Sequence, residues 1–97
     1  MDPTESEVIE WDGANEEHLA RHRIGLWDVE SVIETAIVCI PNRRSRAGAW
    51  KVIGTDPGGR VLSIVCDYDP TRRSIRPITG WVTTASERTK YLKGRRS

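Results

Sequence analysis

Two histidines stand four residues apart in the stretch WDGANEEHLARH, which covers residues 11–22. On a helix, this spacing places His18 and His22 on neighbouring turns of one face, where a pair of imidazoles can bind zinc. No HExxH pattern and no evident third ligand accompany them, so the sequence does not predict a metal site. On a helical wheel His22 lies about 40° from His18 and about 60° from Leu19, at the boundary of the buried face. The residues leave open whether His22 forms structural hydrogen bonds or belongs to a reactive site.

Basic residues gather in the second half of the chain. Residues 1–34 carry ten acidic and two basic residues, a net charge of −8, whereas residues 35–97 carry four acidic and thirteen basic residues, a net charge of +9. Such a division is typical of a protein with one surface for a polyanion and another for a basic or mixed partner, although the two halves can also pair with each other. The basic loop and the basic C-terminus are the best footprint for RNA, and a solvated face or a flexible tail would also explain them. These two groups are Arg43, Arg44, Arg46, Lys90, Lys93, Arg95 and Arg96.

The length and composition indicate one small domain. The chain has 97 residues, of which 37% are hydrophobic, with four Trp and no Phe, so a core of Val, Ile and Leu is expected. No apolar run is long enough for a transmembrane helix, and the N-terminus lacks the features of a secretory signal, which together favour a cytoplasmic protein. Cys39 and Cys66 each lie in an apolar run and are expected to be buried free thiols. We expect a single domain over 1–97, with 1–6 and 94–97 flexible.

The pattern of elements is that of an α+β protein with a mainly antiparallel sheet packed with helices, in the order β-α-α-β-β-β-β-α. Helices begin after the N-cap residue Asp12 and at the Thr84/Glu87 capping box, and they are expected to run to about Arg23 and Lys93. The remaining elements are a β-prone run at 7–11, an amphipathic helix at 26–36, and strands at 36–40, 49–55, 60–68 and 74–82.

Three local features refine this pattern. The sequence DPGG between the strands at 49–55 and 60–68 favours a tight reversal, which predicts a hairpin. Pro77 withholds a backbone donor, so its position must be an edge or a bulge. Trp27 falls toward the polar side of its helix, where an exposed indole suggests a partner surface.

Five short motifs carry a resemblance to a known family over nearly the whole chain, from about Val8 to Tyr91. They are IEWD, HRIGLWDV, WKVIGTDPGGRVLSIV, IRPIT and TTASERTKY, in this order. In order and spacing the chain resembles BrnT-like proteins, the toxin half of a bacterial type II toxin–antitoxin pair, whose fold is related to the RelE ribonucleases.

The resemblance implies a small endoribonuclease that cuts RNA without a metal or other cofactor and arrests translation. It also implies a partner, an antitoxin that is usually a ribbon-helix-helix protein. Contact with DNA would then be indirect, through the antitoxin, and no membrane is involved. The acidic first third of the chain would suit an antitoxin segment that carries Lys and Arg.

Cleavage of RNA without a metal needs a group that deprotonates the 2′-OH, a cation near the phosphate, and a group that protonates the leaving oxygen. At the family's polar positions the chain offers side chains that can serve in these roles. The resemblance thus implies a catalytic set of His22, Arg76, Glu87, Arg88 and Tyr91. Together with the basic loop, it implies an RNA-binding set of Arg43, Arg44, Arg46, Lys51, Trp81 and Lys90.

One departure from the family matters more than any match. After the last strand the family usually presents an arginine, and the aligned residues here are Trp81 and Val82. The indole of Trp81 can stack on an unpaired base, or it can simply cover the end of the sheet. The alternative to a ribonuclease is therefore a catalytically degenerate member of the same fold, a module that binds protein or RNA.

Overall fold

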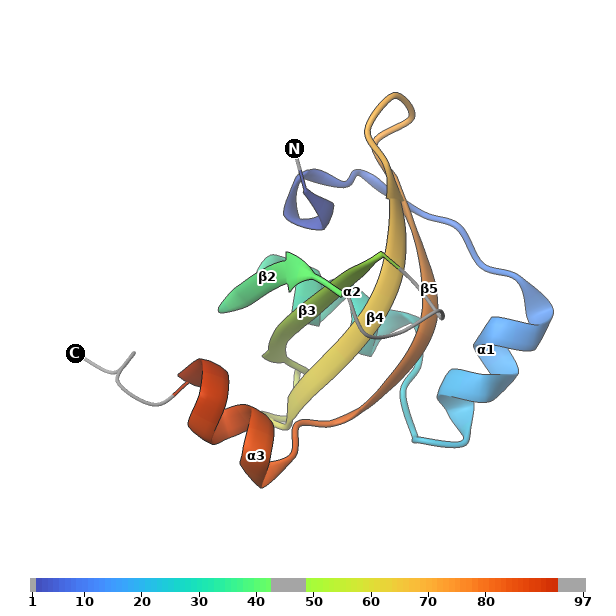
Figure 1. Cartoon of the computed structure of the whole chain (residues 1–97). Helices are drawn as coiled ribbons and strands as arrows, with labels where there is room; N and C mark the ends of the chain where they lie inside the picture. Colours follow the sequence, from blue (N-terminus) through green and yellow to red (C-terminus); the bar gives the residue numbers. More distant parts are fainter. Residues whose placement is uncertain (1, 43–48, 93–97) are drawn as a thin grey trace.

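Five strands form one mixed sheet in the order β1-β5-β4-β3-β2 (Figure 1). A computed structural model describes residues 2–42 and 49–92 of the chain. The neighbouring strands are antiparallel except for the parallel pair of β1 and β5. The prediction of an α+β protein with a mainly antiparallel sheet is therefore confirmed. The strands are β1 (Val8–Ile9), β2 (Val38–Pro41), β3 (Trp50–Thr55), β4 (Val61–Asp69) and β5 (Ser74–Val82).

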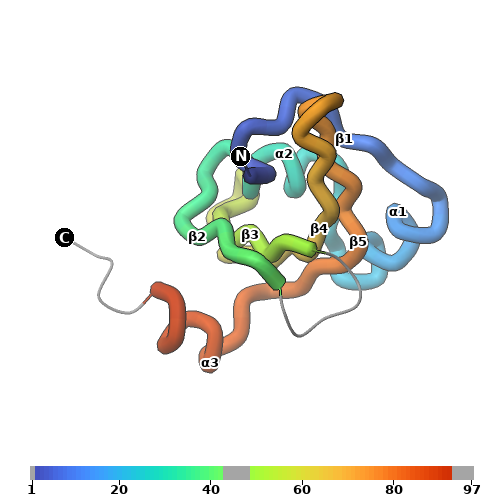
Figure 2. Tube along the Cα trace, turned by 45° about the horizontal axis from the view of Figure 1, so that its top comes forward, coloured from blue at the N-terminus to red at the C-terminus, as the bar shows by residue number. Residues whose placement is uncertain are grey.

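The helical segments lie on both sides of this sheet. Helices α1 (Gly13–Ala20) and α2 (Leu26–Glu34) pack on one side, and α3 (Ala85–Glu87) lies across the sheet from α2 (Figures 1 and 2). A 3-10 turn, η1 (Pro3–Glu5), precedes β1, and a π-helical turn, η2 (Arg88–Leu92), continues α3. Between β5 and Leu92, the last described residue, the chain therefore forms only short helical turns.

The apolar core fills the space between the sheet and the first two helices. Leu19 of α1 and Val32 of α2 pack there with Val52, Leu62 and Ile64 of the central strands, and all five side chains are fully buried. Successive residues of a strand point to opposite faces, so Lys51 and Ser63, which are adjacent in sequence to the core residues, point to the face that carries α3. Trp81 pairs with Ser63 and points to the same face. One face of the sheet therefore packs against α1 and α2, and the other face carries the side chains of Lys51, Ser63 and Trp81.

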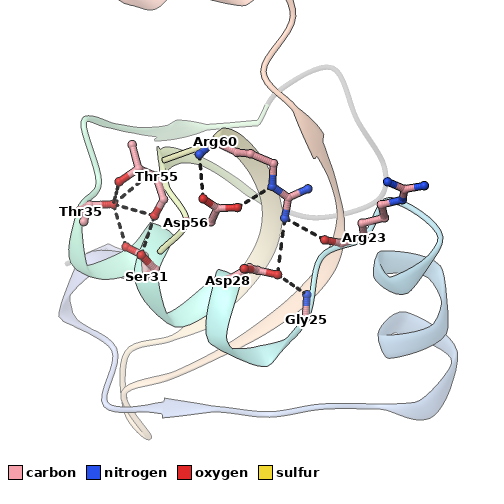
Figure 3. A network of polar contacts seen from close by, with 8 residues as sticks. All are labelled: Arg23, Gly25, Asp28, Ser31, Thr35, Thr55, Asp56 and Arg60. Atoms are coloured by element: carbon pink, nitrogen blue, oxygen red, sulfur yellow. Dashed lines mark hydrogen bonds and ion pairs between the residues drawn. The ribbon is translucent and has the colours of Figure 1, made fainter. Parts of the chain in front are cut away.

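Helix α2 approaches the sheet closely at Gly54 of β3. A Cβ atom at this position would lie 2.4 Å from the backbone oxygen of Val32 and 2.9 Å from Thr35 Oγ1. Only glycine fits this approach without a shift of the helix. Ser31 Oγ donates to Thr55 O at 2.7 Å and Thr55 N donates to Thr35 Oγ1 at 2.8 Å, so polar contacts hold the same seam (Figure 3).

A second set of contacts joins the β3–β4 turn to the start of α2 (Figure 3). The buried Asp56 accepts from the backbone and guanidinium of Arg60. Arg60 also donates to Arg23 O at 2.8 Å and lies 3.6 Å from Asp28 Oδ2. Asp28 in turn accepts from Gly25 N at 2.9 Å and caps α2. We call the contacts around Gly54 and around Asp56 together the hairpin seam.

Several sequence predictions are confirmed by these elements. The strands β3 and β4 form the expected hairpin, and Asp12 caps α1 by accepting from Asn15 N. Thr84 and Glu87 form the expected capping box. The register between β4 and β5 shifts between Val65 and Cys66, and Cys66 pairs with Pro77, so Pro77 lies at a bulge, one of the two predicted alternatives.

Two predicted element ends are wrong, and a third lies outside the described residues. Helix α1 ends at Ala20 and not near Arg23, because Arg23 adopts a left-handed backbone with φ of 59°. Strand β2 includes Pro41, which pairs with Trp50, whereas the strand was expected to stop before it. The C-terminal helix is α-helical for three residues only and continues as η2 to Leu92; the predicted end at Lys93 lies outside the described residues.

The two cysteines of the chain are free, as predicted; Cys66 is buried and Cys39 is half-buried. Burial raises the pKa of the Cys66 thiol to about 12, so the thiol stays protonated. The predicted flexible tail 94–97 lies outside the described residues, whereas Pro3 within the predicted flexible start is buried. Within the described ranges, no helix is long and apolar enough to cross a bilayer.

Candidate RNA-binding cluster at the C-terminal helix

Glu87 sits at the junction of α3 and the sheet. Its backbone N–H donates to Thr84 Oγ1 at 3.1 Å, and its carboxylate accepts from Thr84 N at 2.9 Å. This capping box fixes the first turn of a helix that would otherwise be too short to hold its own shape. The carboxylate is thereby aimed back at the sheet.

Side chains from three strands converge on the Glu87 carboxylate. Lys51 Nζ of β3 donates to Oε2 at 2.9 Å, and Trp81 Nε1 of β5 donates to Oε1 at 2.8 Å. Ser63 Oγ of β4 donates to Oε1 at 3.2 Å. The ion pair is largely shielded from water, since the side chains of Lys51 and Glu87 are 16% and 11% exposed.

These contacts decide the protonation of Glu87. Burial alone would raise the pKa of this carboxyl, but the hydrogen bonds from Thr84, Lys51 and Trp81 outweigh burial and lower the pKa to about 2. A general base works best when its pKa is near the working pH. Glu87 is therefore a poor proton acceptor at neutral pH and a strong anchor for Lys51.

Two aromatic rings flank the ammonium group of Lys51. Its Nζ lies 5.5 Å from the ring centroid of Trp81 and 5.6 Å from that of Tyr91. A second cation, Lys90, has its Nζ 5.2 Å from the Tyr91 ring. These are cation–π distances, and they place two ammonium groups beside one tyrosine.

An open pocket of about 360 Å³ borders this group. The residue Asn42 at its rim directly precedes the basic loop with Arg43, Arg44 and Arg46, which lie outside the described residues, as do Lys93, Arg95 and Arg96 of the tail. Side chains from β2, β3 and the C-terminal helix line the pocket, among them Ile40, Lys51, Ser86, Glu87, Lys90 and Tyr91. We call the group Lys51, Trp81, Glu87, Lys90 and Tyr91 the C-terminal cluster.

The structure therefore brings together five of the predicted site residues and separates others. His22 lies exposed in the turn after α1, with its ring centroid 5.8 Å from that of His18, and it does not line the pocket. Arg76 lies toward the other end of β5, where it pairs with Glu10 at 3.4 Å. Arg88 is exposed on the C-terminal helix next to Glu87 in sequence.

Two polar residues that the sequence did not predict support the cluster. Ser63 is fully buried and Thr83 is nearly so, and their hydroxyls lie 2.9 Å apart. Ser63 interrupts the apolar run VLSIV of β4, which was the available signal. A buried hydroxyl in a central strand needs a partner, and Glu87 and Thr83 supply it.

The described part of the chain contains no group of three or more His, Cys, Asp and Glu side chains placed to hold a metal ion. No family model matches the sequence, and no curated protein matches it either.

Proposed function

We propose that the protein is the toxin component of a bacterial type II toxin–antitoxin pair and a metal-independent endoribonuclease that contacts RNA through the C-terminal cluster. The observation that carries this proposal is the placement of Lys51, Lys90 and Tyr91 around one open pocket. The resemblance of the five sequence motifs to BrnT-like toxins supplies the reaction class.

Each group of the cluster has a role in this proposal. Lys90 is exposed and meets the RNA backbone, while Lys51 places a second positive charge deeper in the pocket, where charge develops on the phosphate. Tyr91 presents an aromatic ring to a base and a hydroxyl for proton transfer. Glu87 acts as a positioning residue, since its carboxylate holds Lys51 and Trp81 in place.

A second candidate function is RNA binding without cleavage. Two observations favour it: Trp81 stands where the family usually has an arginine, and its indole N–H is bonded to Glu87. The strongly ionised Glu87 also leaves the pocket without a carboxylate poised to accept a proton near pH 7. In this case the same surface would hold single-stranded RNA and leave it intact.

The deciding experiment measures binding and cleavage of a long single-stranded RNA by the purified chain in EDTA, with and without ribosomes. Tyr91→Phe keeps the ring and removes the hydroxyl, so we expect it to retain binding and to lose cleavage by roughly 10²-fold or more. Tyr91→Ala is expected to weaken both. Tyr68→Phe is the matched control, because Tyr68 lines a different pocket beside Arg72 and Arg76.

The outcomes separate the two candidates. Cleavage that persists in EDTA and disappears in Tyr91→Phe supports the ribonuclease, and growth arrest on expression should disappear in the same variant. Intact RNA with binding that depends on Tyr91 supports the binding module. Binding that is equal in the parent and in Tyr91→Ala would overturn the assignment of this surface.

A further inference from the structure

A second pocket lies between the edge strand β1 and helix α2. It has a volume of about 320 Å³, and its apolar lining comes from Val8, Ile9, Trp11, Leu26 and Ile33. We call it the β1–α2 groove. Val8 is 50% exposed and Leu26 is 42% exposed, so large aliphatic side chains face water along this groove. Exposed apolar side chains that line one concave pocket are a common feature of binding sites.

The rim of the groove is acidic. Glu7, Glu30 and Glu34 line it together with the apolar side chains. Glu7 lies 3.7 Å from Arg73 in a solvent-exposed pair, whereas Glu30 and Glu34 have no ion-pair partner among residues 2–42 and 49–92. The segment that forms the groove belongs to the first 34 residues, whose net charge is −8. Uncompensated negative charge beside an apolar floor favours a basic partner.

Trp27 extends the same surface. Its side chain is 75% exposed, and Trp27, Glu30 and Glu34 follow one another at helical spacings of three and four, on one stripe of α2. Trp27 is complementary to an apolar group of a partner, and Glu30 and Glu34, one and two turns further along the helix, are complementary to cations. Tryptophan is also among the residues that most often dominate binding energy in interfaces.

The groove and the C-terminal cluster occupy different regions of the molecule. In Figure 2 the strand β1 and helix α2 lie in the upper part, whereas α3 lies at the lower left, across the sheet. No residue lines both pockets. A ligand in one therefore leaves the other accessible.

We propose that the β1–α2 groove docks a segment of a protein partner that carries lysine or arginine around apolar anchor residues. The acidic rim disfavours RNA and anionic lipid, and the apolar floor distinguishes docking from attraction by charge alone. The identification of this partner as the antitoxin rests on the proposed function. The chemistry of the groove does not depend on it.

The test uses three synthetic peptides as probes and amide chemical shifts of the whole chain as the readout. One peptide is an amphipathic pattern of Lys and Leu, the second replaces every Leu with Ser, and the third replaces every Lys with Glu. We expect saturable shifts at Val8, Leu26 and Ile33 with the first peptide only. Glu30→Lys with Glu34→Lys, and separately Leu26→Ser, should each weaken that binding by about tenfold or more.

Matched variants make the result specific. Glu16→Lys with Glu17→Lys on α1 changes the net charge equally on an exposed surface away from the groove, and should leave peptide binding nearly unchanged. Equal weakening in both double variants, equal binding of the Ser peptide, or self-association that depends on Leu26 would overturn the proposal. RNA binding is measured in parallel: a chain that binds the Lys/Leu peptide in the groove and binds no RNA refutes the proposed function alone.

Discussion

The hairpin seam and the C-terminal cluster are both built around a carboxylate whose pKa is lowered. At Asp56 the hydrogen bond from Arg60 is the main cause, with a backbone contribution from the same residue. At Glu87 the donors come from three strands and from the helix cap. A carboxylate with a lowered pKa therefore does not by itself distinguish a structural network from a candidate site.

The difference lies in what surrounds each carboxylate. The guanidinium of Arg60 interacts with Asp56, Asp28 and the backbone oxygen of Arg23 (Figure 3). These contacts join the β3–β4 turn to the start of α2. The C-terminal cluster instead lines an open pocket, in which Lys90 is exposed and Lys51, paired with Glu87, lies deeper. Changes in the seam should therefore act on stability, and the proposed function adds that changes in the cluster should also affect RNA binding or cleavage.

The largest effect on stability is expected from Gly54→Ala in the seam. The new Cβ would meet the backbone oxygen of Val32 at 2.4 Å, and a backbone atom in a packed helix cannot move aside cheaply. We expect a loss of about 3 kcal/mol or more in the free energy of unfolding, measured by urea denaturation. Gly13→Ala is the control, because no atom lies within 4 Å of its Cβ position, and it should be close to neutral. An unchanged urea midpoint for Gly54→Ala would contradict the close approach.

An intermediate effect is expected from Glu87→Gln in the cluster. The amide offers N–H groups where Lys51 Nζ also donates, so one strong interaction is lost. A folded-state pKa of about 2 against 4.5 corresponds to roughly 3 kcal/mol of stability that is fully present above pH 4.5. This contribution disappears as the pH falls from 4.5 through 2, because the folded carboxyl then becomes protonated.

Urea unfolding of the parent and of Glu87→Gln across this pH range measures that contribution. The two proteins should differ most at neutral pH and converge in acid. Glu34→Gln is the matched control, since Glu34 is exposed and has no ion-pair partner within the described residues, and its difference from the parent should stay flat. A difference for Glu87→Gln that does not vary with pH would show that Glu87 is not the ionised anchor.

The contrast between the two regions also explains which parts of the structure the sequence alone predicts. The hairpin, the Asp12 cap and the Thr84/Glu87 capping box follow from local spacing and turn residues, and the structure confirms them. The left-handed backbone of Arg23 had no such signal, so the end of α1 was misplaced. Local patterns predict local structure well because the interactions that stabilise it join residues close in sequence.

The contacts within the candidate site depend on the register of the sheet, which the sequence does not show. Lys51, Ser63 and Trp81 come from three strands and meet only because Lys51 pairs with Val65 and Ser63 pairs with Trp81 across β3, β4 and β5. The sequence named Lys51, Trp81, Glu87 and Tyr91 as separate candidates, without their mutual contacts. The sequence also set Arg76 and His22 beside them, because motif position does not show which end of a strand or which element lies at the pocket.

The smallest effect is expected from Arg76→Ala, and it tests how far the proposed RNA-binding surface extends. Arg76 is 52% exposed, and Glu10 keeps Ser74 and Arg72 as partners when Arg76 is removed. Exposed ion pairs of this kind contribute about 0–1 kcal/mol, so the free energy of unfolding should barely change. Arg76 also lies five residues from Trp81 along β5, roughly 16 Å for an extended strand and beyond the Debye length at physiological salt.

RNA cleavage by Arg76→Ala should therefore stay within about twofold of the parent at physiological salt, because screening leaves little of its field at the pocket. Arg88→Ala, next to Glu87 on the C-terminal helix, should reduce cleavage more than Arg76→Ala does. The measurement is a rate of cleavage at equal RNA concentration for the three proteins. A strong loss in Arg76→Ala with binding at the cluster intact would mean that RNA runs along the sheet from the C-terminal cluster to the β4–β5 turn, where Arg72 and Arg76 flank one carboxylate.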